Sequence, residues 1–296
     1  MPLKTLKNET PEALSLEWIL HIKNYKLDLD KNRCVGCQIC SLACPKEAIH
    51  PQKQPKERGE KAKKARIDVD LNKCNFCGIC DVFCPYGAMR VSIDGQHVIS
   101  VVDKESFPQF TRNIQIDATK FLPESAKLDE ACPLDLMQVS SKTADGRSVL
   151  EVQKEYCPGC RLCEVKLPEG AIHVEKIIYG KLAINASECP QGCRDCLDIC
   201  PIEGALYLSE EDGKVHVDER FCVYCGACKI TCPVEKAIGL KRTKINHTAV
   251  RSGAWNKALE RLTSPVEMTK ELKSKGSMRA REAVKKRVGL REEEHA

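Results

Sequence analysis

Twenty cysteines in 296 residues, about one in fifteen, are the side chains of this sequence whose type and spacing could do chemistry. Three groups of four share the spacing C-x2-C-x2-C-x3-C, and a proline follows each group. These groups are Cys34, Cys37, Cys40 and Cys44; Cys74, Cys77, Cys80 and Cys84; and Cys222, Cys225, Cys228 and Cys232. The run is typical of proteins that bind 4Fe–4S clusters through cysteine thiolates.

The other eight cysteines form two groups that vary this pattern. One group has an additional residue in its first gap and comprises Cys189, Cys193, Cys196 and Cys200, followed by Pro201. The last group is split, because the triad Cys157, Cys160 and Cys163 has no fourth cysteine after it, and Cys132-Pro133 stands alone upstream.

The spacing also predicts which thiolates share a cluster. Three cysteines on one tight loop can reach three corners of a cluster, with backbone N–H groups facing the sulfurs. The fourth cysteine lies past the loop, before a proline suited to the first turn of a helix, and ligates the other cluster of a two-cluster unit. Cys132 must then complete the split group.

This crossed rule assigns every cysteine as a ligand of one of five predicted 4Fe–4S clusters, so the predicted metal is iron. We number the five ligand sets as sites 1 to 5. Site 1 is Cys34, Cys37, Cys40 and Cys84; site 2 is Cys74, Cys77, Cys80 and Cys44; site 3 is Cys157, Cys160, Cys163 and Cys132; site 4 is Cys189, Cys193, Cys196 and Cys232; site 5 is Cys222, Cys225, Cys228 and Cys200.

The split group is interpreted as a two-cluster unit that has lost one cluster. Extending the spacing of the other groups places the lost ligands at Phe121, Ser125, Leu128 and Leu167, and none of these side chains ligates iron. We expect apolar side chains to fill the vacated volume. The iron content is therefore predicted to be about 20 atoms per chain rather than about 24.

Zinc, disulfides and histidine ligation are the alternatives. Structural zinc sites use two cysteine pairs separated by a longer loop, which does not fit three thiolates at i, i+3 and i+6. The first residues lack a secretory h-region, and no apolar run approaches the roughly 20 residues that span a bilayer. A cytoplasmic, soluble location is expected, where thiols stay reduced. The seven histidines stand apart from the cysteine groups and are expected on the surface or in strands.

Composition agrees with a fold stabilised by metal centres, because aromatic residues are only 5% of the chain and charged residues are 30%. The expected fold class is α+β, with tandem two-cluster ferredoxin modules of short helices and paired strands and a helical C-terminal tail. The expected divisions are a docking segment (1–21), a two-cluster first module (22–106), a degenerate one-cluster middle module (107–180), a two-cluster third module (181–241) and a basic tail (242–296).

Alternating segments predict strands before the cysteine loops and after the helices, and a short helix is expected after each Cys-Pro. The residues from Pro51 to Lys64 are expected to be an exposed insertion. Predicted strands are Lys26–Asp30, Arg66–Asp70, Ala88–Ile93 and Ala171–Val174.

Charge is distributed unevenly along the chain. From Lys241 onward, 15 Lys/Arg stand against 7 Asp/Glu, a net charge of +8, whereas the preceding residues carry a net charge of −3. Oxidised clusters would add about −10 to the body of the protein. Helices are expected at Asn256–Thr263 and Val266–Leu290. Without interleaved aromatics or a recognised motif, we expect the tail to dock on a partner subunit or to be solvated rather than to bind nucleic acid. Leu14–Leu20 is the second predicted docking segment.

The sequence indicates electron transfer without catalysis on this chain. It contains no Walker loop, no G-x-G-x-x-G and no C-x-x-C-H haem site. Each predicted cluster has four protein thiolates and no open iron position, so it would carry single electrons rather than bind substrate.

With these motifs, the chain resembles the archaeal polyferredoxins, and among them the polyferredoxin (F) subunit of formylmethanofuran dehydrogenase. The narrower resemblance is based on Glu188–Cys196, Cys222–Lys229, Ser252–Leu259 and Leu16–Leu20. It implies a non-catalytic subunit of an oxidoreductase complex that exchanges electrons with a low-potential donor or acceptor.

The resemblance also implies two partner subunits. One is a molybdopterin subunit with tungsten or molybdenum that interconverts CO2 and formate, and the other is an amidohydrolase-like subunit. Family members carry more than five clusters, so a shorter path for electrons through this chain is expected. An electron-transfer subunit of a hydrogenase or heterodisulfide reductase assembly and a free polyferredoxin carrier remain as alternatives.

Overall fold

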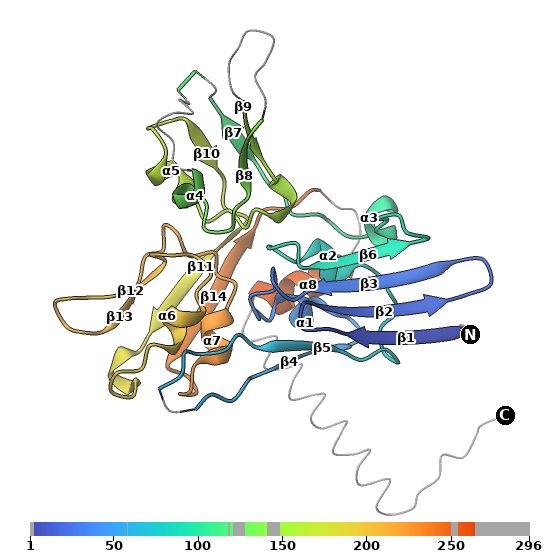
Figure 1. Cartoon of the computed structure of the whole chain (residues 1–296), viewed down its shortest axis with the longest axis horizontal. Coiled ribbons are helices and arrows are strands. Elements are labelled where there is room, and N and C mark those ends of the chain that lie inside the picture. The colour runs from blue at the N-terminus through green and yellow to red at the C-terminus, as the bar shows by residue number, and fades with distance from the viewer. Residues whose placement is uncertain are drawn as a thin grey trace, which may run out of the picture.

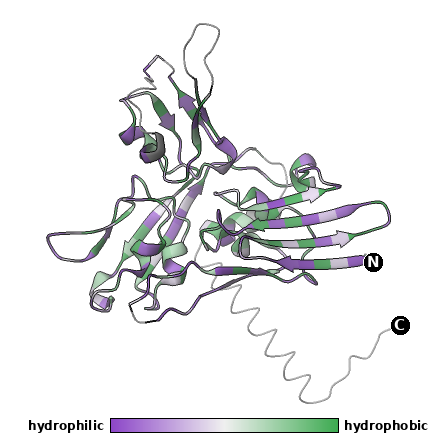
Figure 2. Cartoon of the chain, in the orientation of Figure 1, coloured by the Kyte–Doolittle hydropathy of each residue, from purple (hydrophilic) through white to green (hydrophobic). Residues whose placement is uncertain are grey.

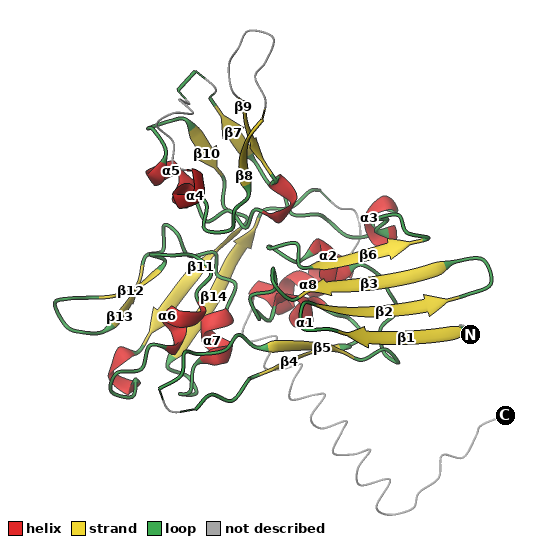
Figure 3. Cartoon of the chain, viewed as in Figure 1, coloured by secondary structure: helices red, strands yellow, loops and turns green. Residues whose placement is uncertain are grey.

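The computed structural model describes residues 3–57, 59–117, 119–120, 128–140, 149–249 and 254–263. Short helices and small antiparallel sheets are joined by loops (Figure 3). Most cysteines lie in these loops, and the third cysteine of each group lies in a short helix. The first and third modules lie side by side, and the middle module projects away from both (Figure 1). The expected combination of short helices and paired strands is thus present.

The largest sheet of the described chain joins the N-terminal segment (1–21) to the first module. It is antiparallel in the order β1-β2-β3-β6, and a separate β4-β5 ribbon lies beside it (Figure 1). The elements are β1 (Lys4–Glu9), β2 (Ala13–Ile19), β3 (Asn24–Asp30), α1 (Ile39–Ala43), β4 (Ile49–Gln52), β5 (Arg66–Val69), α2 (Ile79–Val82), β6 (Met89–Ile93) and α3 (Ser100–Asp103).

Hydrophobic residues alternate with polar ones along β2 and β3, as Figure 2 shows. Leu14, Leu16, Leu27 and Leu29 are at most 1% exposed, because a period of two places them on one face of the sheet. Leu14 and Leu16 are therefore not available to a partner. The docking role of residues 1–21 stays a prediction. Any docking would have to use other side chains of this hairpin.

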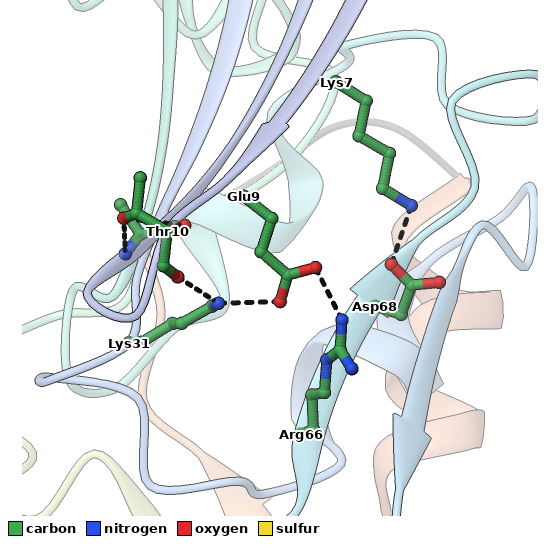
Figure 4. A network of polar contacts seen from close by, with 7 residues as sticks. Lys7, Glu9, Thr10, Lys31, Arg66 and Asp68 are labelled. Carbon is green, nitrogen blue, oxygen red and sulfur yellow. Dashed lines mark hydrogen bonds and ion pairs between the residues drawn. The ribbon is translucent and has the colours of Figure 1, made fainter.

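Ion pairs tie this N-terminal hairpin to β5 (Figure 4). The Lys7 ammonium lies 2.7 Å from the Asp68 carboxylate, and Glu9 accepts hydrogen bonds from Lys31 at 2.7 Å and from Arg66 at 2.5 Å. The N-terminal strands are therefore held to the first module by polar contacts as well as by the sheet.

The middle and third modules each consist of two small ribbons and two short helices. The middle module has β7 (Ile114–Ile116) paired with β10 (Ile172–Val174), β8 (Met137–Ser140) paired with β9 (Val149–Val152), and α4 (Leu128–Ala131) beside α5 (Leu162–Lys166). The third module has β11 (Ile178–Ile184) paired with β14 (Ile238–Ile245), β12 (Leu206–Leu208) paired with β13 (Val215–Val217), and α6 (Asp195–Ile199) beside α7 (Ala227–Thr231). Single 3-10 turns precede two cysteine loops, at Lys154–Tyr156 and Ala186–Glu188.

The predicted strands are confirmed, but the position predicted for the helices is wrong. Helices α1, α6 and α7 end before the fourth cysteine of their groups, instead of starting after Cys-Pro. Cys44, Cys200 and Cys232 cap them with ψ values of 114°, 119° and 127°. A residue that precedes proline is driven into this extended region, so Cys-Pro stops a helix rather than starting one.

The tail begins with α8 (Ala254–Thr263), which confirms a helix over the predicted Asn256–Thr263. It is not merely solvated, because Ala258 and Leu262 are buried and the helix packs on α1. The helix predicted at Val266–Leu290 lies outside the described residues. The first residues counted with the basic tail, including Arg242, belong instead to strand β14 of the third module.

Candidate iron–sulfur centres

The cysteine loops share one backbone feature, a left-handed residue before the second cysteine. Non-glycine residues occupy this conformation in two loops, Phe76 with φ 54° and Tyr224 with φ 52°, which is uncommon for bulky side chains. Glycine occupies it in the other three loops, at Gly36, Gly159 and Gly192. This turn aims successive N–H groups into the concave side of the loop, a geometry that binds negative charge.

Gly36 also shows how closely the first loop is packed. A Cβ at this position would lie 2.6 Å from the backbone nitrogen of Ala65. The loop between Cys34 and Cys37 is therefore seated directly on the chain that leads into β5, and a side chain at residue 36 would displace it.

The fourth cysteines of three groups receive a backbone hydrogen bond from the residue four positions later. Ala48 N–H donates to Cys44 Sγ at 3.4 Å, and Ala88 N–H donates to Cys84 Sγ at 3.1 Å. Leu136 N–H donates to Cys132 Sγ at 3.5 Å in the same way. The isolated Cys132 thus has the local geometry of a fourth cysteine.

Two cavities are each lined by a complete predicted ligand set. One is lined by Cys200, Cys222, Cys225 and Cys228, which are site 5. The other is lined by Cys132, Cys157, Cys160 and Cys163, which are site 3. The remaining walls of both cavities are mostly apolar, and Arg161 also lines the cavity of site 3. Two spaces that are each surrounded by four thiols fit a cofactor of one kind, held by four thiolates.

In the first module, the thiols approach one another across the two groups. Burial raises the pKa of Cys34, and the nearby Cys84 sulfur raises it further. Burial likewise raises the pKa of Cys74 to about 11, and there the Cys44 sulfur contributes. Cys84 therefore lies near the triad of site 1 and Cys44 near that of site 2, in agreement with the crossed arrangement.

Site 4 is the most exposed of the five ligand sets. Its loop residues Pro190, Gln191 and Gly192 are exposed, and Cys189 and Cys193 are only partly buried. Burial raises the pKa of Cys189, with further contributions from the sulfurs of Cys193 and then Cys232. Among the five ligand sets, this end of the third module is therefore the most accessible to another protein.

None of the twenty cysteines forms a disulfide. Within the described residues, no three Cys, His, Asp or Glu side chains converge tightly enough to hold a single metal ion. Burial raises the pKa of Cys160 to about 12. Binding of a cluster must therefore displace protons from thiols such as this one. The donor set fits 4Fe–4S clusters, which are held by four thiolates.

The predicted loss of a cluster from the middle module can be examined at one of its four positions. Leu167 caps α5 where other groups have their fourth cysteine, and it is 5% exposed within the apolar core of this module. This agrees with the predicted apolar infill. Phe121 and Ser125, and the side chain of Leu128, lie outside the described residues.

Cationic side chains that the sequence analysis did not single out hydrogen-bond to carbonyl oxygens of the cysteines. Arg112 of the middle module donates from Nε to Cys157 at 3.1 Å and from Nη2 to Cys84 of the first module at 3.3 Å. Lys176 Nζ donates to the Cys222 carbonyl oxygen at 2.9 Å. These cations lie where negative clusters would bind, and Arg112 links site 3 to site 1.

The insertion that follows β4 is exposed, as predicted, but it also contacts the third module. Lys53 Nζ donates to the carbonyl oxygen of Cys232 at 2.8 Å, and Lys56 pairs with the buried Asp195 carboxylate of α6. The backbone N–H of Ala62 donates to Asp198 at 3.3 Å. The insertion thus fastens the first module to the third beside site 4.

The first and third modules also share one apolar core. It contains Cys37, Phe83 and Tyr86 from the first module together with Cys225 and Cys228 from the third. Burial raises the pKa of Cys37, and the strongest contribution from a neighbouring charge comes from Cys225. Sites 1 and 5 are therefore neighbours, although the last cysteine of the site 1 loop, Cys40, and the first of the site 5 loop, Cys222, are 182 positions apart in the sequence.

Comparison with known proteins supports the cluster-binding assignment. The family described as "4Fe-4S dicluster domain" matches residues 33–88 and 180–236, which lie in the first and third modules. The polyferredoxin-like subunit of the aliphatic sulfonate oxidoreductase of Pyrococcus furiosus is 34% identical over 105 residues, 31% of this chain and 58% of that protein. The electron transport protein HydN of Escherichia coli is 33% identical over 93 residues, 26% of this chain and 51% of that protein. The chain thus spans between half and three-fifths of these relatives.

A solved structure matches nearly the whole chain. It is a chain of the formate dehydrogenase–heterodisulfide reductase–formylmethanofuran dehydrogenase complex of Methanospirillum hungatei, with a TM-score of 0.77 and 28% identity. The match covers 89% of this chain and 92% of that one. No helix among the described residues is long and apolar enough to cross a bilayer.

Proposed function

We propose that this electron-transfer polyferredoxin, with its two 4Fe–4S dicluster domains, is the subunit that carries electrons to or from a formylmethanofuran dehydrogenase within a larger redox complex. The observation that carries this proposal is the structural match over 89% of the chain to a component of a complex containing that enzyme. The partners would be a molybdopterin subunit with tungsten or molybdenum and an amidohydrolase-like subunit.

We further propose five clusters, at sites 1 to 5 with the crossed ligands given above. When bound, each cluster accepts and returns one electron without binding substrate. The chain's own residues bind, orient and separate these centres. Two cysteine-lined cavities and the proximity of Cys84 and Cys44 to the opposite triads support the ligand sets.

The ligand sets follow one another in space in a definite order. Cys80 lies near Cys40, which brings site 2 beside site 1, and Cys196 lies near Cys228, which brings site 4 beside site 5. Together with the contact between Cys37 and Cys225, this gives the order 2, 1, 5, 4, with site 3 attached to site 1 through Arg112. The main line of sites therefore passes from the first module to the third, and the middle module is a branch.

The first experiment is anaerobic purification of the native protein from its source, with identification of the co-purifying subunits and measurement of iron, tungsten and molybdenum. We expect a molybdopterin subunit, an amidohydrolase-like subunit and about 20 iron atoms per chain. A hydrogenase or a heterodisulfide reductase as the sole partner would retain electron transfer but refute the formylmethanofuran assignment. A lone chain containing iron would indicate a free carrier.

A further inference from the structure

Tyr86 has a buried hydroxyl group that makes no hydrogen bond of regular geometry to any described residue. Its side chain is 3% exposed, and the Cys225 sulfur approaches Oη as a weak partner. Buried polar atoms are almost always hydrogen-bonded, so an exception calls for a specific explanation. Because the clusters would supply charged sulfur acceptors here, the missing partner of Oη can be a ligand sulfur.

The fold itself does not require a hydroxyl at this position. Tyr86 follows Cys84-Pro85, and the residue after Cys-Pro in the other groups is Lys46, Leu134, Ile202 or Val234. Three of these four residues are aliphatic, although each follows the same Cys-Pro turn. An apolar side chain is therefore sufficient for packing, and the tyrosine hydroxyl must be explained by its surroundings.

Those surroundings are thiols of both dicluster modules. The sulfur of Cys225 acts most strongly on the Tyr86 hydroxyl, followed by those of Cys37 and Cys200. The ring lies in the core that contains Cys37 and Cys225. It also lines a cavity between the modules together with Cys34 and Cys200. The hydroxyl thus lies where ligands of sites 1 and 5 meet.

We propose that Tyr86 Oη donates a hydrogen bond across the module boundary to the sulfur of Cys225, so that a side chain of the first module sets the reduction potential at site 5 in the third. This inference depends on the ligand sets of the proposed function. A thiolate bound to iron is a stronger acceptor than a thiol. A hydrogen bond to a cluster sulfur raises the potential, because it offsets the negative charge added on reduction.

The role of Tyr86 is that of a positioning residue, since it would act on the cluster through a ligand. Its hydrogen bond would favour an electron at site 5 over one at site 1, because the hydroxyl donates to a ligand of site 5. Tyr86 itself belongs to the module of site 1. An electron at the contact between the two dicluster modules would then reside preferentially in the third module.

The test is a redox titration of Tyr86→Phe, followed by electron paramagnetic resonance, on the anaerobically purified protein with its partner subunits. Phenylalanine keeps the ring and removes only the donor. We expect one of the cluster transitions to move to a more negative potential while the iron content stays at the wild-type value. The matched control Tyr207→Phe removes an exposed phenol that stacks on His216 and should shift no transition. Unchanged potentials in Tyr86→Phe with full iron would overturn the inference.

A second variant covers the case in which Tyr86→Phe loses iron. Incorporation of 3,5-difluorotyrosine at residue 86 keeps the hydroxyl and makes it a stronger donor, so the same transition should move to a more positive potential. No shift, or a shift in the negative direction, would overturn the inference. If wild-type protein holds no reducible clusters, the proposed function itself fails. If its clusters titrate but do not respond to either change at residue 86, only this inference fails.

Discussion

Arg242 Nη2 donates a hydrogen bond of 2.8 Å to the carbonyl oxygen of Cys225, and its Nε donates one of 2.9 Å to the carbonyl oxygen of Tyr224. The side chain is 6% exposed and makes no ion pair with a carboxylate among the described residues. Burial lowers the pKa of Arg242, whereas the sulfurs of Cys37 and then Cys225 favour its charged form. A buried cation without an anionic partner is costly, so the negative charge that balances Arg242 should be the clusters at sites 1 and 5.

Replacing Arg242 with glutamine should therefore lower the potentials at these two sites. Reduction adds negative charge, and removal of a nearby buried cation disfavours the reduced state. We expect a shift on the order of −50 mV, roughly a tenfold change in the one-electron equilibrium constant. Redox titration measures the shift, and Arg242→Lys should retain most of the wild-type potential.

Arg220→Gln is the matched control, because the Arg220 side chain is 75% exposed and pairs with Asp218. It should leave all transitions in place. If Arg242→Gln keeps its iron and shows no negative shift, the positive charge at residue 242 does not act on the clusters.

The ligand set of site 3 predicts a characteristic pattern of iron loss. Cys132→Ala should leave about 16 iron atoms per chain instead of about 20, because four irons leave with one cluster. Cys157→Ala should give the same value, and so should the double variant, since both cysteines would hold the same cluster. Iron and acid-labile sulfide analysis after anaerobic purification measures this. A double variant with about 12 iron atoms would mean that Cys132 and Cys157 bind different clusters.

The cysteine pattern predicted the local structure of this protein well. Regular spacing fixes which loops can surround a cluster, and alternation of apolar residues located strands such as β3 and β6. The position of the helices was misjudged, because Pro45 and its equivalents were interpreted as helix starts, although the stronger effect is on the preceding cysteine.

The arrangement of the modules could not be predicted from spacing, because it depends on contacts between distant residues. Arg242 was counted as part of a basic tail, yet strand pairing with β11 places it in the core between the dicluster modules. The sequence did contain a signal for Tyr86, since among the five Cys-Pro pairs only this one is followed by an aromatic residue. Arg112 offered none, because its two cysteine partners lie 28 and 45 residues away in the chain.

Lys56 is predicted to stabilise the attachment of the third module. Its ammonium pairs with Asp195, whose side chain is 7% exposed, so Lys56→Ala leaves a buried carboxylate without this partner. The variant should therefore unfold at a lower temperature than the wild-type protein, because an unpaired buried carboxylate is destabilising. Thermal unfolding of the cluster-loaded protein and the rate of proteolysis within residues 53–64 measure the effect. Lys63→Ala removes a half-exposed lysine that pairs with Glu60 three residues before it, and should change neither quantity. Equal effects of the two variants would refute a specific role for Lys56.

The ion pairs of Glu9 are predicted to make a pH-dependent contribution to the stability of the N-terminal hairpin. The hydrogen bond from Lys31 lowers the pKa of Glu9 below its usual value of 4.5, and Arg66 lowers it further, although desolvation opposes both effects (Figure 4). Because the folded-state pKa is depressed, the stabilisation is present above the unfolded value and is lost as the pH falls through the folded value. Glu9→Gln should therefore cost about 1 kcal/mol near neutral pH, since these partly exposed pairs are individually weak, and progressively less below about pH 4.5.

The observable is the difference in unfolding free energy between Glu9→Gln and wild type across this pH range, because acid also protonates the thiolates and affects both proteins alike. Glu12→Gln is the matched control, since the Glu12 carboxylate makes no ion pair among the described residues, and it should give a difference near zero at every pH. A constant difference between Glu9→Gln and wild type down to about pH 3 would show that the Glu9 charge does not stabilise the hairpin, and that the variant acts through packing or the unfolded state instead.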